Sequence, residues 1–372
     1  MNTLEQKIIN KIEKDGPTTF ETFMEMALYE PSLGYYASDK TEIGRAGDFY
    51  TSQHLHPIFG AMIGKQLVEM WEVMGKPSEF YVVELGAGAG LMCMDIMSYL
   101  QKREIYHSFT YVIVELNPSI QKKQKRLLEK YSDKVKWVSP FKELGDIKGC
   151  ILSNELLDAF PVHLIEMEDE LKEIYVNVNN DHIHETKGNP STDALNDYLC
   201  EFSINLPRGY RTEVNLKIKD WLRSVNEVLL EGFVLTIDYG YPAWDYYSDD
   251  RNRGTLMCYY KHQVNEDPYR NIGQQDITAH VNFSSVKKWG EKLGLETLGF
   301  CQQGTFLISL GIDEIIKELY ENASDYLFEV AKIKKLIFPG TIGETHKVLI
   351  QYKGKGKPNL RGFVMKNQMN KL

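Results

Sequence analysis

The sequence lacks the features that mark several common protein classes. Its five cysteines form no CxxC pair and have no histidine at ligand spacing, which argues against a disulfide framework and a structural zinc site: Cys93, Cys150, Cys200, Cys258 and Cys301. No run of about 18 apolar residues is present, so we expect no membrane-spanning helix. The first residues, Met1–Glu5, have no apolar stretch typical of a secretion signal, and their acidic residue opposes a mitochondrial transit peptide. We therefore expect a cytoplasmic protein with reduced thiols and no bound metal.

Basic residues are fewer than acidic ones. The 372 residues include 43 Lys and Arg against 52 Asp and Glu, which gives a formal net charge of −9. This balance argues against a broad phosphate-binding surface, so nucleic acid is not the expected partner. The apolar fraction of 43% is that of an ordinary globular protein, and the length suits one elaborated domain or two small ones.

The first part of the chain predicts helices around a long loop. Residues 4–14, 20–28 and those after Pro57 carry apolar side chains at helical spacing, whereas residues 34–56 have no periodicity. A loop of this length inside a compact domain is usually functional, although an ordinary surface loop is the alternative. We therefore interpret residues 1–76 as an N-terminal helical cap with a lid loop.

Strand-like segments alternate with helices from residue 77 to residue 352. The expected strands are 80–85, 111–115, 135–138, 150–153, 233–238, 295–301 and 347–352. Such alternation predicts a doubly wound, mostly parallel sheet of the α/β class. We expect two insertions, a β-rich one at about 162–212 and one rich in Tyr and Asp at about 239–283. The basic tail, residues 353–372, is expected to be flexible in solvent.

A glycine loop follows the first predicted strand, in the run Glu84-Leu85-Gly86-Ala87-Gly88-Ala89-Gly90. Glycine permits backbone angles closed to other residues and lets a ligand approach the chain closely. A dinucleotide-binding loop has the pattern GxGxxG, whereas here the third glycine comes one residue early. No Gly-Lys-Ser/Thr follows, which excludes a P-loop. A tight turn without a ligand is the alternative interpretation.

Glu115 stands at the end of the next predicted strand. A carboxylate at this position of a nucleoside-binding sheet can accept hydrogen bonds from both hydroxyl groups of a ribose. Together with the glycine loop, Glu115 indicates an adenosine ligand without a pyrophosphate, and S-adenosylmethionine is the obvious candidate. A helix-capping or solvent-facing role for Glu115 stays open.

Four segments of this sequence recur together in one known family. They are Gly44–Ser52, Val83–Gly90, Ser153–Pro161 and Ile237–Gly240. In these segments the chain resembles the MidA-like proteins, whose eukaryotic members are the mitochondrial complex I assembly factor 7 proteins. Those members are regarded as protein arginine methyltransferases that make symmetric dimethylarginine. The resemblance covers most of residues 15–350.

The resemblance implies a seven-stranded class I methyltransferase fold, which is Rossmann-like, with an N-terminal helical cap. Because no organelle-targeting leader is apparent, a bacterial member is expected, which leaves the link to a respiratory complex open. The charged residues of the loop before Ser52 would meet the amino-acid end of the methyl donor. The residues expected to contact the cofactor are Glu84, Gly86, Gly88, Gly90, Glu115, Asn154, Arg45, Asp48 and Thr51. The catalytic candidates are Glu155, Asp158, Asp238 and His280.

The candidate carboxylates suit a cationic substrate. Glu155 and Asp158 follow the fourth predicted strand and Asp238 follows the fifth, so all three are expected beyond the carboxyl edge of the sheet. A protonated guanidinium group needs carboxylates that bind it in bidentate fashion, and His280 could orient it or accept a proton. Helix capping, salt bridging and a purely structural histidine are the alternatives for these residues.

The sequence leaves other functions open. A small-molecule or RNA methyltransferase is possible, although the acidic balance disfavours RNA. Amino-base methyltransferases usually carry Asn/Asp-Pro-Pro-Tyr/Phe, and here Asn154 is followed by Glu155. A third alternative is an assembly chaperone that binds the cofactor without turnover. The methyl acceptor and the oligomeric state are not predicted.

Overall fold

The computed structural model describes residues 3–38, 55–321 and 326–372. The chain divides into two compact units, each built from several stretches of sequence. Of the described residues, the first unit takes 3–38, 157–221 and 241–286. The second takes 55–156, 222–240, 287–321 and 326–372.

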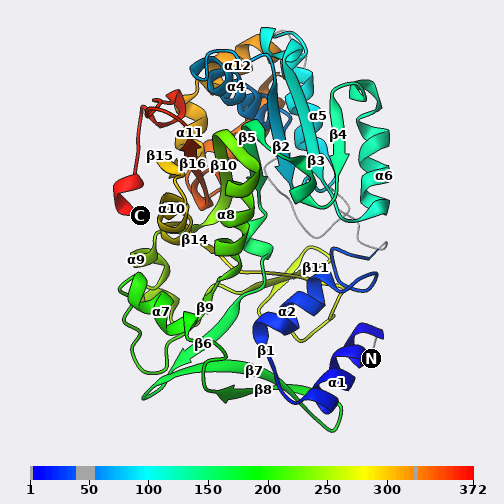
Figure 1. Ribbon diagram of the computed structural model, residues 1–372, viewed down its shortest axis with the longest axis vertical. Helices are drawn as coiled ribbons and strands as arrows, with labels where there is room; N and C mark the ends of the chain where they lie inside the picture. Colours follow the sequence, from blue (N-terminus) through cyan, green and yellow to red (C-terminus); the bar gives the residue numbers. More distant parts are fainter. Residues whose placement is uncertain (1–2, 39–54, 322–325) are drawn as a thin grey trace. The chain divides into compact units, whose positions relative to one another are not determined.

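The second unit is built on a long mixed sheet, drawn as neighbouring arrows in Figure 1. Seven of its eight strands follow the order β15-β16-β10-β5-β2-β3-β4, and the short β14 (Val281–Asn282) also pairs with β10. From β10 to β4 all neighbours run parallel, whereas β16 is antiparallel to both β10 and β15. The bounds are β2 (Phe80–Leu85), β3 (Phe109–Val114), β4 (Val135–Val138), β5 (Ile147–Asn154), β10 (Leu229–Tyr241), β15 (Glu296–Gln302) and β16 (His346–Lys353). Each predicted strand is present within a few residues of its expected bounds.

Helices cover this sheet because their apolar faces are buried against it. Side chains of α4, α5 and the central strands share one hydrophobic core, in which Phe59, Met62, Ile96 and Phe233 are fully buried. The helices assigned to this unit are α4 (Ile58–Val73), α5 (Leu91–Leu100), α6 (Pro118–Leu127), α11 (Gln303–Ser309), α12 (Ile312–Tyr320), α13 (Tyr326–Ile337) and α14 (Ile342–Thr345), with short 3-10 turns at η1 (Glu104–His107), η2 (Glu129–Tyr131), η3 (Phe141–Leu144), η6 (Arg361–Phe363) and η7 (Met369–Lys371). This is the predicted seven-stranded methyltransferase architecture.

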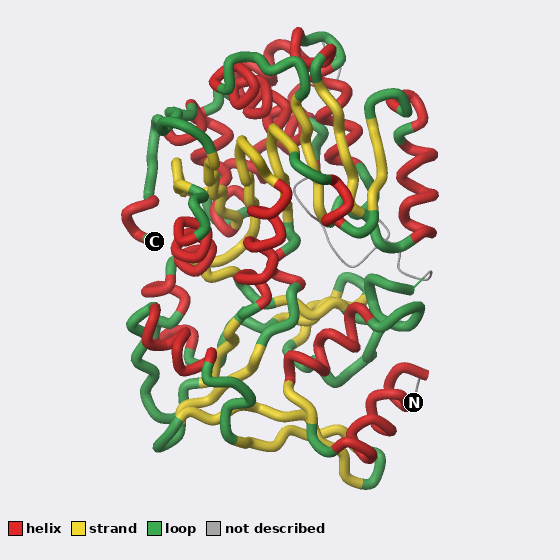
Figure 2. The backbone as a smooth tube through the Cα atoms, viewed as in Figure 1, coloured by secondary structure: helices red, strands yellow, loops and turns green. Residues whose placement is uncertain are grey.

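The first unit joins the N-terminal helices to the two insertions. One antiparallel sheet has the order β1-β7-β6-β9, with β8 also paired to β7, and a second has the order β12-β11-β13; Figure 2 shows strands in yellow. Its own hydrophobic core includes Phe20 and Phe23 of α2 and Ile174 of β7. The bounds are α1 (Thr3–Asp15), β1 (Thr18–Thr19), α2 (Phe20–Tyr29), η4 (Leu157–Ala159), β6 (His163–Met167), β7 (Leu171–Asn179), β8 (His182–Gly188), α7 (Ala194–Glu201), β9 (Arg211–Val214), α9 (Ala243–Tyr246), η5 (Asp249–Arg251), β11 (Met257–Tyr260), β12 (Gln263–Asn265), β13 (Asp276–Thr278) and β14 (Val281–Asn282). The chain passes between the units within α8 (Lys217–Val228) and α10 (Phe283–Lys292), as well as near the ends of β5 and β10.

These units differ from the expected division into a cap of residues 1–76 and a domain of residues 77–352. Helix α4 belongs to the core of the second unit, because its apolar residues pack with α5. The N-terminal helices α1 and α2 share a core with the strands of the predicted β-rich insertion. The sequence could not show this grouping, since it depends on contacts between segments more than 100 residues apart, such as the 2.8 Å hydrogen bond from the Tyr29 hydroxyl to the Ala159 carbonyl.

The C-terminal tail does not follow the expectation of a flexible segment in solvent. Leu360 and Phe363 are buried in the core of the second unit, and the Phe363 ring lies 5.5 Å from that of Phe306. Gly299 and Gly362 permit this packing, because an added Cβ atom at either position would come within 2.2 Å of a phenyl ring. The basic composition of the tail predicted a segment exposed to solvent. Instead, Leu360 and Phe363 anchor it in the core, and the two glycines leave room for the phenyl rings.

Candidate active site

The candidate site lies at the edge of the main sheet where its parallel strands end. The register pairs Leu85 at the end of β2 with Ser153 of β5, and Asn154 at the end of β5 with Ile237 of β10. The segments after β2, β3, β5 and β10 therefore leave the sheet at one edge. Parallel α/β sheets bind their ligands beyond this edge.

The glycine loop adopts a backbone that requires glycine. Gly86, Gly88 and Gly90 have φ values of +72°, +52° and +83°, in the left-handed region that other residues rarely enter. A Cβ atom added to Gly86 would lie 3.0 Å from the Leu156 side chain, so this loop also touches the segment after β5. A side chain at any of the three positions would therefore strain the turn that follows β2.

Glu115 is held beside this loop by Gln124 of α6. Its carboxylate accepts hydrogen bonds from the Asn117 backbone N–H at 2.7 Å and from Gln124 Nε2 at 3.3 Å. Gln124 also donates to the Gly88 carbonyl at 2.8 Å and accepts from Trp137 Nε1 at 2.9 Å. Burial raises the pKa of Glu115, and the two hydrogen bonds to it oppose that shift. One buried amide therefore links the glycine loop to the carboxylate expected to bind ribose.

Glu84 occupies the interior of the sheet. Its side chain is buried and accepts a hydrogen bond from the Tyr111 hydroxyl at 2.8 Å. Burial raises the pKa of Glu84 to about 7, although the bond from Tyr111 acts in the opposite direction. In this structure its carboxyl group joins β2 to β3, and a direct contact of Glu84 with the cofactor stays a prediction.

Asn154 carries an unsatisfied amide at the end of β5. The residue is 5% exposed, yet neither Oδ1 nor Nδ2 has a hydrogen-bond partner among the described residues. A buried polar group left in this state costs about 1–3 kcal/mol, so such a group in a native protein points to a ligand. Its position beside β2 and β10 fits the predicted contact with the cofactor.

Glu155 and Asp238 lie together just beyond β5 and β10. Glu155 has φ of +51°, and its backbone N–H donates to the Ile237 carbonyl at 2.9 Å. Asp238 is fully buried and accepts backbone N–H groups with both oxygens, from Leu156 at 3.2 Å and from Tyr239 at 2.9 Å. Asp238 thus fixes the turn that carries Glu155, and a contact of Glu155 with a substrate stays a prediction.

Asp158 and His280 belong to the first unit. The Asp158 backbone carbonyl accepts a hydrogen bond from the Ala279 N–H at 2.9 Å, next to His280. The His280 ring packs against Tyr241, with ring centroids 5.3 Å apart. The structure thus brings these two residues near each other, and their catalytic roles stay predictions. Arg45, Asp48 and Thr51 lie outside the described residues.

Two residues of this edge were missed by the sequence reasoning. Gln124 is a polar residue on the buried face of an amphipathic helix, which is a signal that could have identified it. His346 begins β16, and its Nε2 lies 3.3 Å from Glu155 Oε1. No pattern around His346 identifies it, because its position depends on β16 running antiparallel to β10.

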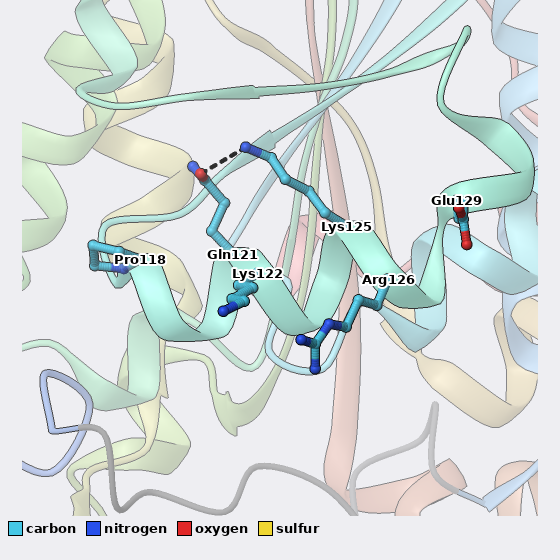
Figure 3. Close-up of a pocket in the computed structure, with 6 residues that line it drawn as sticks. All are labelled: Pro118, Gln121, Lys122, Lys125, Arg126 and Glu129. Carbon is cyan, nitrogen blue, oxygen red and sulfur yellow. Dashed lines mark hydrogen bonds between the residues drawn. The ribbon is translucent and has the colours of Figure 1, made fainter.

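A shallow pocket on α6 lies apart from these groups. It is lined by residues of that helix and the turn after it, which Figure 3 shows as sticks: Pro118, Gln121, Lys122, Lys125, Arg126 and Glu129. The Gln121 side chain accepts a hydrogen bond from Lys125 at 2.9 Å. None of these side chains is a predicted site residue, and we assign this pocket no role.

The described part of the chain was searched for metal sites and for membrane-spanning helices. Within residues 3–38, 55–321 and 326–372, no group of His, Cys, Asp and Glu side chains is arranged to hold a metal ion. In the same described ranges, no helix has the length and apolar character needed to cross a membrane.

The fold and the site together define a class I, S-adenosylmethionine-dependent methyltransferase. Residues 62–301 match the model of a family described as "Putative S-adenosyl-L-methionine-dependent methyltransferase". The chain belongs to this family. A protein from Burkholderia thailandensis described as a likely methyl transferase, solved with bound S-adenosyl-homocysteine, has 28% sequence identity and a TM-score of 0.92, covering 99% of this chain and 96% of that one. S-adenosylmethionine is therefore the cofactor.

Curated relatives carry a more specific name. The Drosophila melanogaster "Protein arginine methyltransferase NDUFAF7 homolog, mitochondrial" is 26% identical, covering 95% of this chain and 85% of the relative. The Homo sapiens "Protein arginine methyltransferase NDUFAF7, mitochondrial" is 27% identical, with 86% and 75% covered. These matches confirm the family suggested by the sequence motifs.

Proposed function

We propose that this methyltransferase modifies arginine side chains of a protein and forms symmetric dimethylarginine. The observation that carries the proposal is the Glu155 carboxylate, held at the carboxyl edge of the sheet on a left-handed backbone. The names of the relatives support a protein arginine substrate. The symmetric pattern and a link to respiratory complex assembly come from the family resemblance and belong to the same proposal, as does a cytoplasmic location.

The chemistry of arginine explains why a carboxylate is needed. A guanidinium group has a pKa above about 12 and is protonated at neutral pH, which leaves its nitrogens poor nucleophiles. When bound, S-adenosylmethionine supplies a methyl group on a sulfonium. The substrate nitrogen forms the new N–C bond, the C–S bond pair stays with sulfur, and one N–H proton is released. Glu155 would bind the guanidinium and accept hydrogen bonds from it as this proton leaves.

The other residues at the carboxyl edge of the sheet would bind the cofactor or hold Glu155 in place. Glu115, positioned by Gln124, is placed for the ribose, and Asn154 offers a buried amide. Asp238 holds the turn on which Glu155 stands. Alignment of the two reactants is the main contribution that a protein makes to such a displacement.

The test uses a protein extract from a strain that lacks this gene. The purified protein and methyl-labelled S-adenosylmethionine are added, and the proteins are hydrolysed for amino-acid analysis. We expect labelled symmetric dimethylarginine with the wild type and a loss of about 100-fold or more in rate with Glu155→Gln. The affinity for S-adenosyl-homocysteine, measured by calorimetry, should change less than about tenfold, since Glu155 is not assigned to the ribose.

Other outcomes would overturn the proposal. Label in RNA or in small molecules would assign the protein to another methyltransferase type. Cofactor binding without any labelled acceptor would favour an assembly protein that binds the cofactor only. If Glu155→Gln transfers methyl groups at the wild-type rate, the Glu155 carboxylate takes no part in the mechanism.

A further inference from the structure

His346 and Glu155 form a buried pair at the carboxyl edge of the sheet. Their side chains are 8% and 9% exposed, and His346 Nε2 lies 3.3 Å from Glu155 Oε1. The two residues are 191 positions apart, and each stands at the end of a strand: Glu155 after β5 and His346 at the start of β16. The pairing of His346 with Tyr239 across β10 and β16 fixes the histidine at this edge.

The pair has hydrogen-bonding capacity that the fold does not use. Glu155 Oε1 and His346 Nε2 are both buried, and neither atom has an aligned hydrogen-bond partner within the part of the chain that the structure describes. The accessible remainder of the Glu155 side chain therefore lies away from Oε1. Because Nε2 and Oε1 are only 3.3 Å apart, a small rotation of either side chain would let the two atoms bond to each other.

The other ring nitrogen of His346 is already engaged. Nδ1 lies 3.1 Å from the Thr345 hydroxyl, which can donate to it. The tautomer that carries its proton on Nε2 lets Thr345 donate to Nδ1 and places the ring N–H on the nitrogen that faces Glu155. The ring is further held by an edge contact with Tyr239, at a centroid distance of 5.5 Å. His346 thus has one ring nitrogen in contact with Thr345 and the other 3.3 Å from Glu155 Oε1.

The backbone of Glu155 is held by groups other than its own side chain. Its φ of +51° is unfavourable for a residue with a side chain, by roughly 1–2 kcal/mol. Backbone bonds hold that turn, from the Glu155 N–H to the Ile237 carbonyl and from the Leu156 N–H to Asp238. None of these bonds fixes the side chain. His346 is the described group within 3.3 Å that can do so.

The geometry points to His346 as the positioning residue of the arginine site. It holds Glu155 Oε1, so that the other carboxylate oxygen faces the guanidinium group. The role assigned to His346 rests on the proposed function of Glu155. His346 acts through Glu155 and is not assigned a contact with the cofactor or with the transferred methyl group.

The first experiment measures methylarginine formation in the extract described above. His346→Ala should lower the rate by about 10- to 100-fold, while the affinity for S-adenosyl-homocysteine stays within about threefold of the wild type. His346→Gln should recover much of the loss, because its amide nitrogen can donate at a similar reach. Adding His346→Ala to Glu155→Gln should cause little further loss, since both changes remove the same interaction.

The matched control is His163→Ala. His163 also pairs with a buried glutamate, since its Nδ1 lies 2.7 Å from Glu173 Oε1 on neighbouring strands of the other unit. This control removes a histidine–glutamate pair without touching the carboxyl edge, and its rate should stay within about twofold of the wild type. Full activity of His346→Ala, additive losses in the double variant, or no recovery with glutamine would overturn the proposal.

A second experiment does not depend on turnover. In protein labelled at histidine and saturated with S-adenosyl-homocysteine, ethylguanidinium chloride serves as the probe for the arginine side chain. The ring resonances of His346 should shift with this probe, but not with sodium chloride and not in Glu155→Gln. An unchanged wild-type ring would overturn the role of His346. If the ring responds but no methylarginine forms, the proposed arginine chemistry fails while the pairing of His346 with Glu155 stands.

Discussion

Gly88 has φ of +52°, and its carbonyl accepts the hydrogen bond from Gln124 that ties α6 to the loop. Gly88→Val should reduce the affinity for S-adenosyl-homocysteine by more than about 100-fold, because a β-branched side chain would strain the turn and would stand where the cofactor is expected to approach the chain. Calorimetry on the folded variant measures this effect.

Gly75→Val is the control for backbone strain alone. Gly75 has φ of +80°, and a Cβ atom added there meets nothing within 4 Å. This variant should lose about 1–2 kcal/mol of stability and keep its affinity for S-adenosyl-homocysteine. A folded Gly88→Val protein with undiminished affinity would place the cofactor elsewhere.

Glu155 and Asp238 are similar residues with different surroundings at the same edge of the sheet. Both carry a carboxylate and both follow a strand of the main sheet, so the sequence predicted one role for them. In the structure, both oxygens of Asp238 accept backbone N–H groups, and this arrangement holds a strained turn in place. Glu155 is the residue on that turn. Sequence position alone could not show that Asp238 supports the turn and that Glu155 stands on it.

At the scale of elements, local patterns predicted the strands and helices well. The apolar run 80–85 and the glycine loop after it are present as expected, because strand, turn and helix signals there depend only on neighbouring residues. The grouping of these elements was not predictable in this way. Helix α4 packs with α5, and α1 packs with strands of the β-rich insertion, through contacts that no local pattern records. His346 was missed for the same reason.

The C-terminal segment offers a prediction at this scale. Phe363 is 6% exposed and packs in the core of the second unit, whereas its neighbour Val364 is 77% exposed. Phe363→Ala should lower the free energy of unfolding by about 3–5 kcal/mol, the usual effect of deleting a buried aromatic ring. Val364→Ala, the matched control, should change it by less than about 0.5 kcal/mol. Denaturant unfolding compares the two, and equal effects would mean that the tail is not anchored in solution.

For the whole molecule, burial of acidic groups sets how stability depends on pH. The protein carries a net charge of −9, but most of its carboxylates lie in solvent. Glu84 and Asp95 are exceptions in the second unit, since burial raises the pKa of each to about 7. A group whose pKa is higher in the folded than in the unfolded state binds a proton more tightly when folded. Both residues therefore stabilise the fold at low pH.

The wild type should lose stability as the pH rises from about 5 to about 8. The contribution of Glu84 is fully present below its unfolded value of 4.5 and is lost as the pH passes through about 7. A shift of this size corresponds to about 3 kcal/mol. Glu84→Gln should remove this part of the pH dependence, while its amide oxygen can still accept the Tyr111 hydrogen bond. The part of the pH dependence that comes from Asp95 should remain. Denaturant unfolding at pH 5 and pH 8 measures the difference, with the exposed Glu79→Gln as the control that retains the wild-type behaviour. An identical pH dependence in Glu84→Gln and the wild type would show that the folded protein holds Glu84 ionised at neutral pH, and that the interior of this sheet is more polar than its packing implies.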